Sequence, residues 1–349
     1  MKSIDRTHST KEFQRLEVTP GKDMLTVVDR LSVLRFGRIL RGCAAPDEKV
    51  TIREWLARSG QSARLCRMLW EPLALATLNQ SIDEAAAKPF FVVISRMFGP
   101  EPEASAVLLP AVPLDELYAL PAVRFLQSAS ATVLTGVRPE VVVSGGRTVG
   151  AQVRDELFET ELVVSSVPWY ALADLFKPIP FELQPIVQRA TALASRPIVT
   201  VNMWFDHIAL DDPMVGLPGR AFQWVFDKHS LVGSGQSHLS LVSSAADAIY
   251  ARPNEELIQM AARELSAALP RFAGEPRHAS VVRERRATFS LRPDGPARPQ
   301  TETPVRGFLL AGDWIDTGLP ATIESAVVSG HRAAAIAEQI LGTRSTRGT

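Results

Sequence analysis

The residues whose types and spacing suggest chemistry are Gly312 and Asp313, near the C-terminus. They follow an apolar run, residues 308–311, that has the composition of a buried strand. In open α/β sheets, ligands bind in a crevice beyond the carboxyl ends of the strands. A glycine there lets a ligand approach the backbone, and a carboxylate accepts hydrogen bonds from a polyol such as a ribose or ribityl chain. We therefore expect Asp313 to bind hydroxyl groups.

A helix is predicted to begin soon after this pair, because Pro320 precedes about five turns of helical apolar spacing. The first N–H groups of such a helix, at about Ala321, Thr322 and Ile323, have no acceptor within it and lie at the positive end of its dipole. They suit an anionic or electron-rich group. An ordinary strand, turn and helix at the end of an α/β domain fits the same spacing, so spacing alone leaves ligand binding open.

The segment LLAGDWIDTGLPATIESAVVSGHRAA, residues 309–334, resembles a known flavin motif. Amine oxidases, protoporphyrinogen oxidases and phytoene-desaturase-like enzymes share this motif at their C-termini, and the version here is most similar to that of hydroxysqualene dehydroxylases. The resemblance implies FAD as cofactor. It also implies that Gly312 and Asp313 lie at the ribityl or phosphate-side hydroxyls, and that Ala321, Thr322 and Ile323 lie against the pyrimidine edge of the flavin ring.

The resemblance covers about residues 24–342. The segment ATVLTGVRPEVVVSGGRTVGAQVRD, residues 131–155, resembles the middle piece of the flavin domain, in which the residue matching Val137 contacts the adenine end through its backbone. The segments at 70–99 and 105–118 resemble the helical part of the dehydroxylases. The implied fold is mixed α/β: an incomplete FAD-binding Rossmann-like domain interleaved with a helical and β-sheet substrate domain.

One expected feature of that fold is missing from the sequence. Family members begin with a strand, a GxGxxG loop and a helix that binds pyrophosphate, and nothing in the 349 residues supplies this unit. We expect a truncated product, a late start, or one half of a split protein whose N-terminal half is separately encoded. In that last case the purified chain carries no flavin until the missing piece is co-expressed.

Five further residues are candidates for a substrate site. Trp70 and Asn79 lie in an apolar helical stretch that could line an isoprenoid tunnel, and Trp204 and Trp224 alternate on neighbouring strands as one wall of a hydrophobic pocket would. An ordinary helical core with a capping asparagine and an ordinary sheet core explain the same patterns. Arg298 lies in a loop that resembles the flavin-proximal stretch of the family.

The elements that must position these residues change in character along the chain. Residues 24–129 have helical apolar spacing and predict three to five helices, with a break at Pro72. Strands are predicted at 131–137, 140–155 and 160–168, forming one small sheet with Gly145-Gly146 as a hairpin turn. Further strands are predicted at 197–206, 221–228, 237–244 and 278–290, with a helix at 254–270.

These elements predict a domain built from separated pieces. The expected division is a polar lead-in (1–23), a helical substrate-domain segment (24–129), an FAD-domain segment (130–178), a substrate-domain sheet and helix (179–302), the C-terminal FAD-domain strand and helix (303–342) and a tail (343–349).

Composition excludes several classes of function. Lysine plus arginine equals aspartate plus glutamate at 38 each, so no net charge favours nucleic acid. Two cysteines without CxxC spacing and six histidines without HxH or HxxxH spacing argue against a disulfide framework and a metal site. No apolar run approaches the ~20 residues of a membrane-spanning helix. We expect a cytoplasmic protein, with attachment at a membrane surface left open.

Three functions fit this sequence. The resemblance implies an FAD-dependent oxidoreductase that removes the hydroxyl of hydroxysqualene to give squalene in hopanoid biosynthesis. A carotenoid-type desaturase or a flavin amine oxidase shares the same motif. The third hypothesis is a cofactor-free remnant or a partner subunit of a split enzyme. The sequence identifies no catalytic acid or base.

Overall fold

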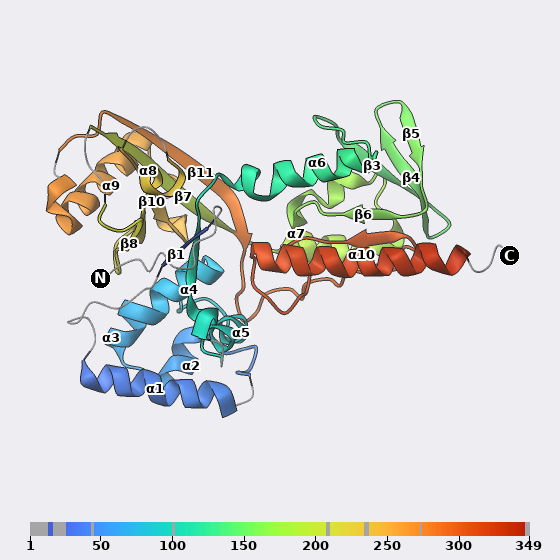
Figure 1. Cartoon of the computed structure of the whole chain (residues 1–349). Coiled ribbons are helices and arrows are strands. Elements are labelled where there is room, and N and C mark those ends of the chain that lie inside the picture. The colour runs from blue at the N-terminus through green and yellow to red at the C-terminus, as the bar shows by residue number, and fades with distance from the viewer. Residues whose placement is uncertain are drawn as a thin grey trace. The chain divides into compact units, whose positions relative to one another are not determined.

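The computed structural model describes residues 13–16, 26–42, 45–99, 102–206, 210–233, 237–272 and 274–345 (Figure 1). The chain forms two compact units: Met1–Val133 with Ser195–Thr288, and Leu134–Ala194 with Phe289–Thr349. Both mix helices with sheets, and the mixed α/β class predicted from the sequence is confirmed. Most of the predicted lead-in and tail lies outside the described residues.

The unit boundaries differ from those expected. Residues 179–194 and 289–302 belong to the second unit, although the sequence pattern grouped them with the substrate domain. The reason is packing: Ile186 and Val187 are buried in the same hydrophobic cluster as Phe308 and Leu310. A helix that shares a core with a strand belongs to the domain of that strand.

The first unit contains the helices predicted for residues 24–129. They are α1 (Val27–Gly42), α2 (Ile52–Arg58), α3 (Ala63–Leu65), the π-helical turn η2 (Cys66–Trp70), α4 (Glu71–Leu78), α5 (Ala87–Met97), the 3₁₀ turn η3 (Pro102–Ser105), the π-helical turn η4 (Asp115–Ala119) and α6 (Leu120–Ser128). Two short strands, β1 (Phe13–Leu16) and β2 (Val107–Pro110), pair antiparallel.

Pro72 does not break the helical stretch as the sequence suggested. The chain remains helical from Ala63 to Leu78, because the π-helical turn ends immediately before α4 and places Pro72 in the first turn of α4. The Glu71 N–H donates to the Cys66 carbonyl five residues earlier, and this wider π-helical turn accommodates a proline that interrupts the ordinary helical hydrogen bonds.

The second part of this unit is a five-stranded sheet of order β11-β7-β10-β9-β8. Its strands are β7 (Ser195–Phe205), β8 (Met214–Gly216), β9 (Trp224–Asp227), β10 (Ser237–Ser243) and β11 (His278–Phe289), joined with helices α8 (Lys228–Val232) and α9 (Asn254–Ala268) and 3₁₀ turns η8 (Ala246–Ala248) and η9 (Pro270–Phe272). Alternate residues of β7 are buried in a cluster with Leu257 and Leu265 of α9, as period-two patterning predicts.

The second unit holds two smaller sheets. Strands β3 (Pro139–Ser144), β4 (Arg147–Val153) and β5 (Glu156–Glu159) form an antiparallel meander, and β6 (Val163–Ser165) pairs parallel with β12 (Phe308–Leu310). The long helix α10 (Ile323–Ser345), red in Figure 1, follows β12. The remaining elements are α7 (Gln184–Ala192) and the 3₁₀ turns η5 (Trp169–Ala171), η6 (Ala173–Leu175) and η7 (Phe181–Leu183).

The predicted hairpin turn is confirmed, whereas the strand predicted at 131–137 is wrong. Gly145 and Gly146 have φ values of 58° and 70°, the positive angles that a two-residue hairpin turn requires. Residues 131–137 are irregular, and Val133 and Leu134 are 38% and 51% exposed, so this apolar segment has no buried face on which to pair. The segment 160–168 also leaves the predicted small sheet, because its strand β6 pairs with β12.

No helix in the described ranges has the length and apolar character needed to cross a membrane.

Candidate functional site

Gly312 and Asp313 lie where the sequence placed them, at the carboxyl end of a parallel strand pair. Leu310 is opposite Ser165 in the register of β12 and β6, and the Ala311 N–H donates to the Ser165 carbonyl at 2.8 Å. Gly312 has φ 129°, and a Cβ there would lie 3.1 Å from Cδ1 of Trp314. The positive φ favours glycine, and the Trp314 ring leaves little room for a side chain there.

The Asp313 carboxylate is partly withdrawn from solvent. Burial raises its pKa above the ordinary value, whereas N–H donors of Asp313 and Trp314 and the charge of Arg298 act in the opposite direction. A carboxylate has about four acceptor positions, and two backbone donors leave room for ligand hydroxyls. The arrangement can therefore bind a polyol chain, as the sequence predicted.

The start of α10 supplies the second half of the predicted site, with one change. The helix begins at Ile323, so Ala321 and Thr322 precede it. Thr322 acts as its cap: its hydroxyl accepts the Ser325 N–H at 3.2 Å, and its carbonyl accepts the Ala326 N–H at 3.1 Å. The cap takes the N–H of Ser325, and Ile323 stands at the first helical position, where an N–H has no intrahelical acceptor.

Two buried serines of α10 hold the glycine loop against the helix, and the sequence analysis missed both. The Ser329 hydroxyl accepts the Gly312 N–H at 2.8 Å, and the Ser325 hydroxyl donates to the Asp313 carbonyl at 3.0 Å. Both side chains are fully buried. Their spacing, i and i+4 within a stripe of small residues, was the signal available in the sequence.

Arg298 acts on the same loop from the opposite side. Its guanidinium donates to the carbonyls of Leu319 at 2.7 Å and Ile315 at 3.3 Å, and lies 5.5 Å from the centre of the Phe289 ring. The side chain is 12% exposed, and burial lowers the pKa of the guanidinium. The structure therefore makes Arg298 a positioning residue for the loop that follows β12.

Ser165 is a buried polar group at this edge without a described hydrogen-bond partner. Nearby, the Trp314 Nε1–H donates to the Val167 carbonyl at 2.9 Å and ties the loops after the two strands together. A buried polar group without a partner marks a place where a ligand or water completes the structure.

These groups fit a flavin cofactor. Asp313 can accept from ribityl hydroxyls, and the unpartnered Ser165 hydroxyl can donate or accept. Val137 lies in irregular chain two residues before β3 and is half-buried, and its contact with an adenine remains a prediction.

The family model for flavin containing amine oxidoreductases matches residues 12–337. The chain belongs to this family. FAD is accordingly its cofactor, as the motif implied.

Several flavoenzyme relatives are similar over most of the chain. Hydroxysqualene dehydroxylases of Sinorhizobium fredii and Rhodopseudomonas palustris are 30% and 32% identical over 278 residues, which is 78% of this chain and 62% of each relative. A 15-cis-phytoene desaturase of Glycine max is 23% identical over 86% of the chain and 55% of its own length. The chain thus spans less than two thirds of the length of these relatives.

The fold is shared with solved structures at low sequence identity. An oxidoreductase from Methanosarcina mazei superposes with a TM-score of 0.69 at 15% identity, covering 90% of this chain and 73% of the other.

The two substrate candidates of the helical segment, Trp70 and Asn79, make hydrogen bonds within the first unit. Trp70 is completely buried and its Nε1–H donates to Gln61 at 3.0 Å. The Asn79 amide donates to the Arg196 carbonyl and the Thr288 hydroxyl, and its oxygen accepts the Ala245 N–H at 2.6 Å. These contacts explain both residues without a substrate, and a tunnel lined by them stays a prediction.

Trp204 and Trp224 lie on the face of the five-stranded sheet that does not pack on α9. Trp204 stacks on His238, with ring centres 4.3 Å apart. His238 Nε2 lies 3.0 Å from Oδ1 of Asn202. Burial and the charge of Lys228 lower the pKa of His238, and the charge of Asp227 acts in the opposite direction. This face combines large aromatic rings with a small polar cluster, a composition that suits a mostly apolar ligand.

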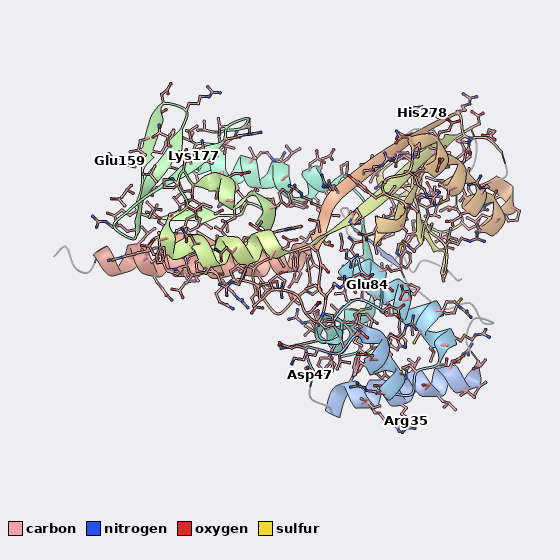
Figure 2. All side chains as sticks on the ribbon, turned by 180° about the vertical axis from the view of Figure 1, so that it is seen from behind. Arg35, Asp47, Glu84, Glu159, Lys177 and His278 are labelled. Atoms are coloured by element: carbon pink, nitrogen blue, oxygen red, sulfur yellow. The ribbon has the colours of Figure 1, made fainter. Side chains whose placement is uncertain are left out.

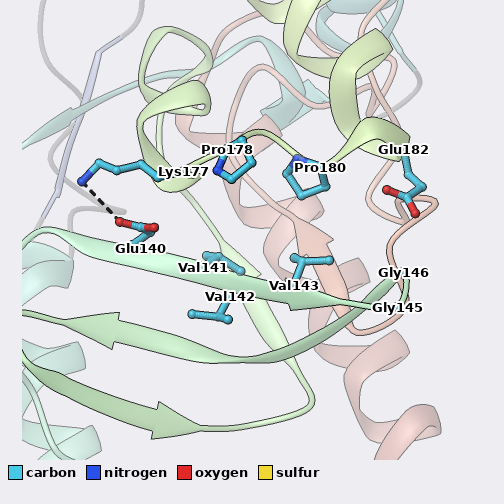
Figure 3. Close-up of a pocket in the computed structure, with 10 residues that line it drawn as sticks. All are labelled: Glu140, Val141, Val142, Val143, Gly145, Gly146, Lys177, Pro178, Pro180 and Glu182. Carbon is cyan, nitrogen blue, oxygen red and sulfur yellow. Dashed lines mark ion pairs between the residues drawn. The ribbon is translucent and has the colours of Figure 1, made fainter.

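A pocket of about 430 Å³ lies elsewhere in the second unit (Figure 3). The Glu140–Lys177 ion pair, 3.2 Å long, lies at one end and Glu182 at the other, beside the Gly145-Gly146 turn. None of the predicted cofactor residues is among the residues that line it.

Proposed function

We propose that the chain is part of an FAD-dependent oxidoreductase that removes the hydroxyl of hydroxysqualene reductively to give squalene, a step of hopanoid biosynthesis. The observation that carries the proposal is the 30–32% identity with hydroxysqualene dehydroxylases over 278 residues. The reaction converts R–OH, two electrons and two protons into R–H and water, and the bound flavin supplies the redox chemistry.

The residues of this chain have two parts in that reaction. Asp313, Ser165 and the start of α10 bind and orient the cofactor, while Arg298, Ser325 and Ser329 hold the loop that carries Asp313. Among the described residues that we assign to the cofactor, Asp313 is the one acid or base. Its role is to bind, because its carboxylate already accepts two backbone N–H groups.

The first unit supports an isoprenoid substrate. Trp204, Trp224 and Phe226 place aromatic rings on the sheet face that carries Asn202 and His238. A long hydrocarbon with one hydroxyl matches a face of aromatic surface with one polar cluster, since apolar area provides affinity and the polar group provides orientation.

A carotenoid-type desaturase is the second candidate, because phytoene desaturases match up to 86% of the chain. It would oxidise an allylic C–C bond, whereas a dehydroxylase reduces a C–O bond. The lower identity, 23% against 30–32%, favours the dehydroxylase.

Product analysis separates the two. The chain is first loaded with FAD and its flavin content is measured, so that failure to bind cofactor is distinguished from the wrong substrate. It is then supplied with hydroxysqualene and a reductant, or with phytoene and an electron acceptor, and the products are identified by mass spectrometry. We expect squalene from the first reaction and no product from the second. A flavin-loaded chain that desaturates phytoene and leaves hydroxysqualene intact contradicts the proposal.

A further inference from the structure

Helix α1 exposes a group of apolar side chains that nothing in the proposed function uses. Val27, Val28, Leu31 and Leu34 are 73%, 74%, 60% and 67% exposed. Positions 27, 31 and 34 are i, i+4 and i+7 of one helical stripe, and position 28 borders it. Single exposed apolar residues are ordinary, but four within about two turns form a patch of the kind that marks a binding surface.

The opposite side of α1 is fixed in the core of the first unit. Phe36 is buried, with its ring centre 5.1 Å from that of Trp55 and 5.2 Å from that of Trp70. The Gln61 amide also donates to the Ser32 hydroxyl at 3.0 Å. Because these contacts fix the rotation of the helix, α1 cannot bury its exposed stripe by turning about its axis.

The only acidic residue of α1 is also directed inward. Asp29 is buried, where it accepts the Thr26 N–H at 3.0 Å and the Ser62 hydroxyl at 2.8 Å. The negative charge of the helix is therefore held by hydrogen bonds within the fold and lies 3.9 Å from Arg64, away from the exposed side chains of the helix.

The exposed charges of α1 are all positive among its described side chains. Arg30, Arg35 and Arg38 are exposed, and Arg38 continues the stripe of Val27, Leu31 and Leu34 at i+11. Figure 2 shows Arg35 on the side of α1 away from the neighbouring helices. We call this surface the outer face of α1. It consists of Val27, Val28, Leu31, Leu34, Arg35 and Arg38.

We propose that the outer face of α1 docks on the surface of an anionic lipid bilayer. Aliphatic side chains would enter the boundary between headgroups and acyl chains, while the arginines pair with lipid phosphates. With 16 residues, α1 is shorter than the ~20 that span a bilayer, so it lies in the plane of the surface.

Charge favours lipid over a second copy of the chain. Two outer faces placed against each other would bring arginines together without an acidic partner, and like charges directly opposed are unfavourable. An anionic bilayer supplies both the apolar phase and the counter-charge that this face lacks.

Vesicle sedimentation tests the proposal. The chain is mixed with vesicles of phosphatidylglycerol and phosphatidylcholine, or with pure phosphatidylcholine. We expect sedimentation with the anionic vesicles, at least tenfold weaker with neutral ones, and loss of binding near 1 M salt, where the screening length is about 3 Å. The variants L31S/L34S and R35E/R38E should each weaken binding about tenfold or more.

Matched substitutions of equally exposed residues control for general effects. V282S/L341S removes two exposed apolar residues elsewhere, and R263E/R285E makes the same change of net charge. Both should bind anionic vesicles like the parent chain, with all variants checked for unchanged thermal unfolding. Absence of binding by the folded parent chain overturns the proposal. So does equal loss in the control variants, or a dimer that L31S/L34S converts to monomer.

Discussion

Two polar regions of this molecule follow apolar segments of the sequence in the same way. They differ in how much of their hydrogen-bonding capacity is left without a partner in the protein. Asn79 ends an apolar helix and Asp313 ends an apolar strand. The Asn79 side chain is 4% exposed and all of its contacts are to the first unit, at Arg196, Thr288 and Ala245. Asp313 accepts only backbone N–H groups of its own loop, and the neighbouring Ser165 hydroxyl has no described partner.

The difference distinguishes polar groups that stabilise the fold from polar groups that bind a ligand. A polar group whose donors and acceptors are all used by the protein stabilises the fold, because removing it leaves its partners unsatisfied. A polar group that can still accept hydrogen bonds, beside a second polar group that has no hydrogen-bond partner, is suited to bind a ligand. We therefore expect changes at Asn79 to affect stability and changes at Asp313 and Ser165 to affect flavin affinity.

The largest effect is expected at Asn79. N79A should lower the free energy of unfolding by about 3 kcal/mol, because it strands the Ala245 N–H and the Arg196 carbonyl and places alanine at φ 51°. N79G tolerates that backbone angle and should lose only about 2 kcal/mol. Urea unfolding measures both.

Flavin affinity provides the control for this prediction. The folded fraction of N79A should bind FAD as the parent chain does, since Asn79 contacts only the first unit in the hydrogen bonds described. A variant with unchanged stability, or one whose defect is confined to flavin, would show that the comparison is wrong.

Arg298 should show both kinds of effect. R298A should cost about 2 kcal/mol of stability, because a nearly buried guanidinium loses its bonds to the Leu319 and Ile315 carbonyls. It should also weaken flavin binding through the displaced loop and raise the pKa of Asp313 further, since the Arg298 charge lowers that pKa. R298K keeps the charge without the fork geometry and should restore the pKa while leaving stability reduced. Unfolding and flavin titrations across pH separate these effects.

The sequence predicted the elements and half of the site because their signals are local. The Gly145-Gly146 turn and the alternation of β7 depend on neighbouring residues only. Ser165 could not be recognised, because its position beside Gly312 follows from the pairing of β6 with β12, two strands far apart in the chain.

The wrong predictions concern residues whose positions also depend on contacts with distant parts of the chain. Residues 131–137 have strand composition but no partner, and α7 was assigned to the wrong domain because its buried face gives no indication of which core receives it. For Arg298 the positioning role was missed, since nothing local shows that its guanidinium reaches the carbonyls of residues 315 and 319, and its contact with a ligand stays a prediction.

D313N should weaken flavin binding about tenfold or more, by removing a charge-assisted acceptor. Stability should change in the opposite sense. Burial raises the pKa of Asp313, so the stability that the carboxyl contributes is present below its unfolded pKa and is lost as pH rises through the folded pKa. D313N should therefore gain stability relative to the parent chain with rising pH. The parent chain's flavin affinity should fall as acid protonates Asp313, and that of D313N should not; equal pH profiles would contradict the assignment.

The smallest effect, and the sharpest test of the comparison, is expected at Ser165. S165A removes a buried hydroxyl without a described partner, so the flavin-free chain should be as stable as the parent or gain up to about 1 kcal/mol, while flavin affinity falls about two- to tenfold. T148V is the matched control. Thr148 has an equally buried, unpartnered hydroxyl, but it lies near Gly307 at the amino end of β12, away from the strand end that carries Gly312. T148V should match S165A in stability and leave flavin affinity unchanged. If both variants bound flavin with equal affinity, the Ser165 hydroxyl at the carboxyl edge would contribute no more to cofactor binding than the Thr148 hydroxyl at the amino edge.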